Sequence, residues 1–219
     1  MAAVVSVALI LAGVTTMVAG APAGAYTNSQ LKSKMLSLSN LPAGWSVSNF
    51  DALDDLSDCI SALQLTTAKH HATVSASFKD GTLPLLEEYL GWVSNGASDD
   101  YKLIVQALRR CRGPMDASLD GVPTTVTVKP MSYRTYGNRS TAFSMGTAFQ
   151  YEGVKLSTGS DLVIFQVRRV VGFVLYGELG IPPPTLSGAF VTEAIDKLEG
   201  KAIPLSLLSC EVTRSCSPS

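Results

Sequence analysis

The sequence predicts an α+β fold, in which an antiparallel β-sheet of about five strands, ending in a C-terminal meander, is packed by helices and stapled by disulfides. Three β-rich runs follow one another through Arg139–Glu178, separated by short breaks, which is typical of a meander. Segments with helical periodicity precede and follow these runs. The chain has 219 residues, enough for one domain with a core, and four cysteines.

The N-terminus has the features of an export signal. Residues 2–25 carry no charge, Val4 to Val18 is apolar, and Ala23-Gly24-Ala25 matches the small-residue pattern that signal peptidase recognises. We therefore expect a signal peptide over residues 1–25 and a secreted, extracellular or cell-envelope protein that begins at Tyr26. An uncleaved membrane anchor is the alternative, although the apolar run is short for a span of about 20 residues. After cleavage we expect no stable membrane span.

Residues 26–200 are predicted to form one domain, and residues 201–219 a cysteine-containing tail. Leu31, Met35 and Leu38 lie at steps of four and three, so we expect a helix from Thr27 or Asn28 to about Asn40. A turn follows, and Trp45 after it is more often a core residue than a ligand contact. The acidic segment Asp51–Asp58 lacks the glycine and the closing glutamate of a calcium loop, which favours the N-terminus of a helix.

The middle of the chain alternates between both kinds of pattern. His70 and His71 are neighbours, and neighbours on a strand point to opposite faces, so they cannot chelate one metal. Ala72–Lys79 alternates between apolar and polar residues and is predicted as a strand. The spacing of Leu86, Leu90 and Val93 predicts a helix that opens at Leu83-Pro84. A second helix, capped by Ser98, ends before Gly113-Pro114.

The remaining strands lie in the second half. Asp116–Gly121 is predicted as a loop, and Thr124–Val128 as a strand because it is rich in β-branched residues. The meander comprises Arg139–Tyr151, Asp161–Arg169 and Val170–Glu178. A last helix is capped by Thr185 or Ser187 and ends at Gly200, with a buried face formed by Phe190, Val191, Ala194, Ile195 and Leu198.

Composition and motifs exclude several functions. The net charge of −1 offers no basic excess for nucleic acid. The sequence contains no Gly-x-Ser-x-Gly elbow and no phosphate-binding glycine loop, and its two histidines are adjacent. We therefore predict no catalytic residue, no cofactor and no metal. A hydrolase that uses Ser144 or a His–Asp pair is the least favoured alternative.

The four cysteines indicate two disulfides in an exported protein. Of the three possible connectivities we favour Cys59–Cys111, which joins the helices on either side of the first strand, and Cys210–Cys216, which closes a small loop in the tail. Zinc is the weaker alternative, because the chain has no Cys-x-x-Cys pair.

The chain resembles a family of exported actinobacterial, chiefly mycobacterial, proteins that includes the extracellular sensor domain of the Ser/Thr kinase PknH and LpqN-type lipoproteins. The similarity spans most of Leu31–Gly200. It is carried by loose motifs: Leu38-Ser-Asn-Leu-Pro-Ala-Gly-Trp45, Asp58-Cys59, Leu108-Arg-Arg-Cys111, the Gly172–Tyr176 strand and the closing helix to Leu198. The family often has a tryptophan where this chain has Leu108. The resemblance implies a helix-packed, disulfide-stapled sheet with a groove for a cell-envelope ligand, and it implies no catalytic residue.

We therefore expect a non-enzymatic, sensor-like binding protein of the cell envelope. Its ligand would be a small amphiphile, a lipid or a cell-wall fragment, held between the meander and the helices. A secreted, antigen-like protein that binds another protein and no small ligand is the alternative. Arg168 and Arg169 are the candidate polar groups, although a hairpin turn explains them equally well. The candidate ligand-binding residues are Trp45, Trp92, Phe143, Phe165, Arg168 and Arg169, with Phe149 and Phe173 as further aromatic candidates for the lining.

Overall fold

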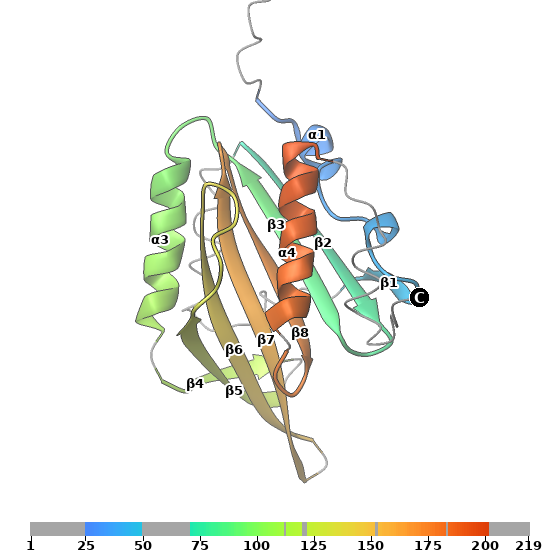
Figure 1. Cartoon of the computed structure of the whole chain (residues 1–219). Coiled ribbons are helices and arrows are strands. Elements are labelled where there is room, and N and C mark those ends of the chain that lie inside the picture. Colours follow the sequence, from blue (N-terminus) through green and yellow to red (C-terminus); the bar gives the residue numbers. More distant parts are fainter. Residues whose placement is uncertain are drawn as a thin grey trace, which may run out of the picture.

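A computed structural model describes residues 25–49, 71–111, 113–119, 122–151, 153–182 and 184–201. These residues form one eight-stranded sheet in which every neighbouring pair is antiparallel (Figure 1). The spatial order of the strands is β1-β2-β3-β8-β7-β6-β5-β4. The strands are β1 (Trp45–Ser48), β2 (Ala72–Asp80), β3 (Leu85–Trp92), β4 (Met115–Leu119), β5 (Val122–Met131), β6 (Arg139–Tyr151), β7 (Val154–Val167) and β8 (Val170–Leu179).

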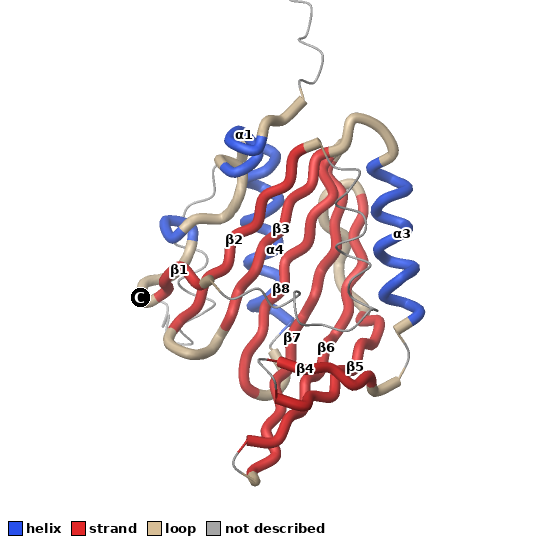
Figure 2. The backbone as a smooth tube through the Cα atoms, turned by 180° about the vertical axis from the view of Figure 1, so that it is seen from behind, coloured by secondary structure: helices blue, strands red, loops and turns tan. Residues whose placement is uncertain are grey.

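Helices flank this sheet. The short α1 (Asn28–Lys32) and the 3-10 turn η1 (Leu38–Asn40) precede β1, α3 (Ala97–Arg110) follows β3, and α4 (Pro184–Glu199) follows β8. Because side chains alternate along a strand, each central strand sends residues to both faces. The α4 face is packed by α1 and α4, and the opposite α3 face is packed by α3. Figure 2, seen from behind, shows β2, β3 and β8 in front of α4.

The prediction of an α+β fold with about five strands is wrong, because the structure is dominated by an eight-stranded sheet. Strands β1, β3 and β4 were not predicted. The segment predicted as a helix from Leu83 is β3, where Leu86 and Leu90 pack on the α4 face while Tyr89 packs on the α3 face. A strand buried on both faces carries no clean alternation, so its apolar residues also fit a helical spacing.

Other boundaries also differ from the predictions. The first helix ends at Lys32 instead of near Asn40, although Thr27 and Gln30 form the capping box that starts it. The predicted loop at Asp116–Gly121 largely becomes β4, and Arg168 and Arg169 form the turn between β7 and β8 instead of ending a strand. The predicted meander residues lie in β6, β7 and β8, which pair in succession.

The predicted cysteine pairs are not supported by the structure. Cys59, Cys210 and Cys216 lie outside the described residues, as do the export signal up to residue 24, the acidic segment and His70. Cys111 is described: it is buried at the end of α3, in the core of the α3 face, and is disulfide-bonded. Among the described residues, no helix combines the length and apolar character needed to cross a membrane.

Candidate functional site

An apolar pocket of about 170 Å³ lies on the α3 face of the sheet, towards the end of the strands that is far from the β7–β8 turn. Five neighbouring strands contribute to it, from β2 through β3, β8 and β7 to β6. Its walls are formed mainly by Leu83, Leu85, Met145, Phe149 and Leu175. A hollow with this lining can accept an alkyl chain or another small apolar group.

The pocket exists because a glycine lies at its centre. Gly177 on β8 has Leu85 on one side and Ser160 on the other in the strand register. A Cβ atom built at Gly177 would lie 2.7 Å from Ser160 Oγ, so any side chain there would enter the space above the sheet. Glycine weakens a strand interior, and it often marks a place where a ligand or another chain approaches the backbone closely.

Polar groups surround this apolar centre. The hydroxyl-bearing residues Ser77, Thr147, Thr158 and Ser160 line the pocket, together with Glu87. Glu178 borders the pocket too, but alternation along β8 directs its carboxylate to the opposite α4 face, where Tyr176 packs. The Tyr176 hydroxyl donates a hydrogen bond to Glu178 Oε2 at 3.0 Å. Burial, reinforced by this carboxylate, raises the pKa of Tyr176 well above its usual range, so the phenol is a donor at neutral pH. Among the described lining residues there is no lysine or arginine.

The pocket continues into an exposed apolar region at one end of the molecule. Val154, Leu156, Leu179 and Ile181, which we call the apolar end, are 58%, 38%, 66% and 88% exposed. Leu156 pairs with Phe149 across the β6–β7 hairpin, and Phe149 lines the pocket. By strand alternation Val154, Leu156 and Leu179 lie on the pocket's face of the sheet. Figures 1 and 2 show this hairpin projecting beyond the rest of the sheet.

The predicted site residues do not come together in this pocket. Phe143 and Phe165 are completely buried on opposite faces, in the cores of the α3 face and the α4 face respectively. Trp45 is half-buried and meets the edge of Phe190 at 5.5 Å between ring centroids. Phe173 stacks on Tyr89 at 5.3 Å in the α3-face core. These contacts are those of core residues.

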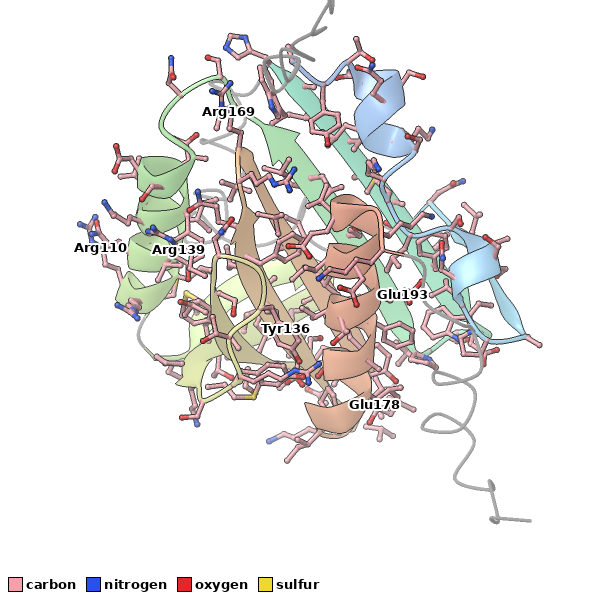
Figure 3. All side chains as sticks on the ribbon, turned by 45° about the horizontal axis from the view of Figure 1, so that its top comes forward. Arg110, Tyr136, Arg139, Arg169, Glu178 and Glu193 are labelled. Carbon is pink, nitrogen blue, oxygen red and sulfur yellow. The ribbon has the colours of Figure 1, made fainter. Side chains whose placement is uncertain are left out.

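Three predicted residues do share a second hollow, also of about 170 Å³. Trp92, Arg168 and Arg169 line it together with Tyr26, Val167, Val170, Leu198 and Glu199. Both arginines are exposed, and Arg168 adopts a left-handed φ of 54° at the turn. Arg169 and Glu178 lie near opposite ends of β8, so this hollow and the apolar pocket are far apart (Figure 3). The second hollow is lined mostly by the β7–β8 hairpin turn and by the C-terminal end of α4.

Sequence reasoning missed most of the apolar pocket. Leu83, Leu85 and Glu87 belong to a segment predicted as a helix, and the contributions of β6, β7 and β8 meet only through the register of the sheet. Phe149 is the exception, because it was named among the possible lining residues. One available signal was Gly177, a glycine inside a run of apolar strand residues.

A buried glutamate on β3 hydrogen-bonds to the backbone of the N-terminal segment on the α4 face. Glu88 on β3 is 0% exposed, and burial raises its pKa to about 8, against the lowering effects of its backbone hydrogen bond and of the Lys197 charge. The Leu36 backbone N–H donates to Glu88 Oε2 at 2.6 Å, while Oε1 has no hydrogen-bond partner in the structure. This contact ties the segment between α1 and η1 to the centre of the sheet.

A second buried chain of polar groups joins α4 to the sheet. The Ser187 hydroxyl donates to Asp161 Oδ2 at 2.6 Å, and the Tyr133 hydroxyl lies 2.6 Å from the Ser187 oxygen. Burial raises the pKa of Asp161, and the Ser187 hydrogen bond opposes that rise. Ser187 and Asp161 are 1% and 2% exposed, so no substrate can reach this serine. The chain of groups therefore serves packing.

The other candidate reactive groups are also unsuited to catalysis. His71 is exposed, its Nε2 lies 3.0 Å from Ser94 Oγ, and its ring packs near Trp92. Ser144 on β6 lies opposite Asp161 in the register and is partly buried. Within the described residues no group of three metal-ligating side chains could hold a metal ion.

Comparison with known proteins gives a match at the level of structure. No protein-family profile and no curated protein sequence matches this chain. The extracellular domain of PknH from Mycobacterium tuberculosis is similar in structure, with a TM-score of 0.61 and 8% identity, covering 81% of this chain and 99% of that domain. LpqN, a protein involved in cell envelope biogenesis of the same organism, is 10% identical in sequence and has a TM-score of 0.28. The match covers 72% of this chain and 78% of the LpqN chain.

The fold of the PknH extracellular domain is therefore present in this chain. The predicted similarity to that group of mycobacterial proteins is confirmed for the fold, and the LpqN score is too low to add to it. An identity of 8% transfers no binding or catalytic residue, so the function has to be argued from the pocket itself.

Proposed function

We propose that this protein is an exported, non-enzymatic binding domain of the cell envelope that holds part of a small amphiphile in the apolar pocket. The observation that carries this proposal is the pocket on the α3 face, where Gly177 leaves an apolar hollow between Leu85 and Met145. The uncharged N-terminal segment with its small-residue motif supports export. The similarity in fold to an extracellular mycobacterial domain is consistent with that location.

A binding role without chemistry agrees with the position of the reactive groups. The pocket is lined by hydroxyls and by the Glu87 carboxylate, but by no histidine or cysteine among the described residues. The buried pair of Ser187 and Asp161 is sealed from solvent. A general base must come within hydrogen-bonding distance of the group that it deprotonates, and neither place offers one next to an accessible nucleophile.

Native mass spectrometry tests the proposal directly. The full chain is expressed in an actinobacterial host, and the recovered protein is measured before and after extraction with organic solvent. We expect an adduct that extraction removes. The variant Ser160→Leu fills the space above Gly177 and should be recovered without the adduct. The control Ser157→Leu lies on the same strand, exposed and on the opposite face, and should keep it.

Two results would contradict the proposal. A clean mass for the parent protein that stays clean after incubation with envelope lipid extract would mean that no amphiphile binds. An adduct that persists in the Ser160→Leu variant would place the ligand elsewhere in the molecule.

A second candidate function, binding to another protein without a small ligand, is favoured by the apolar end. Leu179 and Ile181 are 66% and 88% exposed beside the projecting β6–β7 hairpin, and exposed apolar patches often mark protein contacts. The double change Leu179→Ser and Ile181→Ser should then abolish a defined complex seen by size-exclusion chromatography with light scattering. A complex that survives both changes would contradict this alternative.

A further inference from the structure

We infer that the projecting end of the β6–β7 hairpin rests on a lipid bilayer, with its apolar face inserted at the boundary between head groups and acyl chains. This inference goes beyond the proposed function and does not require a ligand in the apolar pocket. It concerns the apolar end, whose members are Val154, Leu156, Leu179 and Ile181.

The hairpin extends past the strands on both sides of it. Towards its tip, the last residue of β7 that pairs with β8 is Thr158, opposite Leu179, and the last pair between β6 and β5 is Phe149 with Thr124. Beyond these residues, β6 and β7 pair only with each other among the described strands. Figures 1 and 2 show the resulting two-stranded ribbon standing clear of the sheet. Because such a ribbon is marginally stable in water by itself, a surface to pack against would stabilise it.

The ribbon is amphipathic. Val154 and Leu156 lie on the α3 face and are 58% and 38% exposed, whereas Lys155 and Ser157 lie on the α4 face and are exposed as well. Leu179 on the neighbouring strand adds a third aliphatic side chain to the α3 face and is 66% exposed. Strict alternation in an antiparallel sheet normally turns the apolar side towards a core. Here the apolar side stays accessible at the end of the molecule.

The size and composition of this surface fit a bilayer better than a protein. A stable protein interface takes about 800 Å² and roughly 20–30 residues from each partner, and its centre is enriched in aromatic residues and arginine. The apolar end offers aliphatic side chains only, of which Ile181 in the loop after β8 is 88% exposed. Binding at a membrane interface scales with the apolar area that is buried, and it requires no matching surface on a partner.

Charge contributes little to this contact. Residues 147–158 contain one acidic and one basic residue, Glu152 and Lys155, so their formal charges cancel. The attraction that draws basic segments to anionic lipids is therefore absent from this hairpin end. We expect the contact to depend on apolar insertion, with little effect of salt or of lipid charge.

The position of the pocket agrees with this orientation. Phe149 lines the pocket and pairs with Leu156, so apolar side chains run on one face from the ribbon to the pocket. If the pocket binds an amphiphile as proposed, an acyl chain that leaves the bilayer along this face passes over Leu156 and Phe149 before it reaches the hollow above Gly177.

Vesicle flotation tests the inference on the chain recovered after export from an actinobacterial host. Vesicles of phosphatidylcholine are compared with vesicles that also contain phosphatidylglycerol, and the parent protein should bind both. The double variant Val154→Ser/Leu179→Ser should bind at least about tenfold more weakly, because both changes remove aliphatic surface from the contact. The control Val47→Ser/Leu103→Ser changes the same residue types, 63% and 48% exposed on β1 and α3, and should bind like the parent.

A local readout keeps the apolar N-terminal segment from deciding the result. In the variant Val154→Trp, the fluorescence in excess of that from Trp45 and Trp92 should be quenched by lipids that carry bromine on their acyl chains. In the matched variant Leu103→Trp, the added fluorescence should stay unquenched.

Three results would overturn the inference. The first is a parent protein that leaves vesicles unbound, or that binds them without quenching at position 154. The second is a lipid-free protein complex that Val154→Ser/Leu179→Ser abolishes while vesicles stay unbound, which would assign the apolar end to a protein partner. The third is loss of vesicle binding in Ser160→Leu, because the contact would then need the pocket. Vesicle binding that persists in Ser160→Leu supports the inference, whether or not the parent protein carries the adduct that the proposed function requires.

Discussion

Replacing Glu88 by glutamine should change how the stability of this protein depends on pH. The side chain is completely buried, and burial raises its pKa to about 8 from the ordinary value of 4.5. Between these two values the folded protein holds a proton on Glu88 that the unfolded chain releases. The free energy of unfolding therefore falls as pH rises, by about 1.4 kcal/mol per pH unit. Across the whole window the loss approaches about 5 kcal/mol, and it is complete once the pH exceeds the folded pKa.

Glutamine has no proton to release, so the Glu88→Gln variant loses this part of the pH dependence. It can still accept the Leu36 N–H bond through its carbonyl oxygen. Urea unfolding at pH 5, 6, 7, 8 and 9 gives the free energy of unfolding of both proteins. The difference between variant and parent should grow in favour of the variant by about 1.4 kcal/mol per unit up to about pH 8, and then level off.

The slope of the free energy of unfolding against pH, and not the absolute stability, reports the proton on Glu88, because an amide group has its own cost in a site built for a carboxyl group. The control Asp116→Asn removes one exposed carboxylate and corrects for the change in net charge. Parallel pH profiles for the parent and Glu88→Gln proteins would refute the idea that Glu88 is protonated in the folded state at neutral pH.

Two further changes test the packing of α4. Phe190→Ala removes a 0% exposed ring that contacts Trp45 and Tyr176, and it should lower the free energy of unfolding by about 3–5 kcal/mol in urea titrations; a loss below about 1 kcal/mol would contradict its central place in the core. Ser187→Ala removes the hydrogen bond to Asp161 and should cost about 1–3 kcal/mol at neutral pH. Because that bond favours the ionised form of Asp161, the cost should shrink in acid, and an equal cost at pH 4 and pH 7 would count against this account.

The parts of the fold that could be predicted are those with one buried face. The residues Phe190, Val191, Ala194, Ile195 and Leu198 follow helical spacing, and all are buried under α4. Likewise Ala72 and Phe78 of β2 face the α4-face core, as the alternation of this strand predicts. In such segments the pattern along the chain records which side meets the core, so local sequence is sufficient.

The parts that could not be predicted are those whose environment is set by distant segments. β3 lies between β2 and β8 in the sheet and is buried on both faces, so Leu86 and Leu90 fit two periodicities equally well. The two glutamates between them also favour a helix by local propensity, and the tertiary context overrides that preference. The pocket is harder still, because Leu85, Gly177 and Ser160 become neighbours only through strand register. A sequence shows the glycine but not the side chains that leave the space above it empty.

A pocket of this kind should lower stability, and filling it provides the last prediction. Leu85 and Met145 face a hollow where a packed core would place another side chain, so the protein forgoes apolar burial there. Ser160→Leu adds an apolar side chain to that space and should raise the free energy of unfolding by about 1–2 kcal/mol, if the leucine is buried. The same change should remove the bound amphiphile, so stability and binding would move in opposite directions, as they do where a site is kept open for a ligand. A Ser160→Leu variant destabilised by more than about 1 kcal/mol in urea would show that the space is already filled, and the argument for a binding pocket on this face would fail with it.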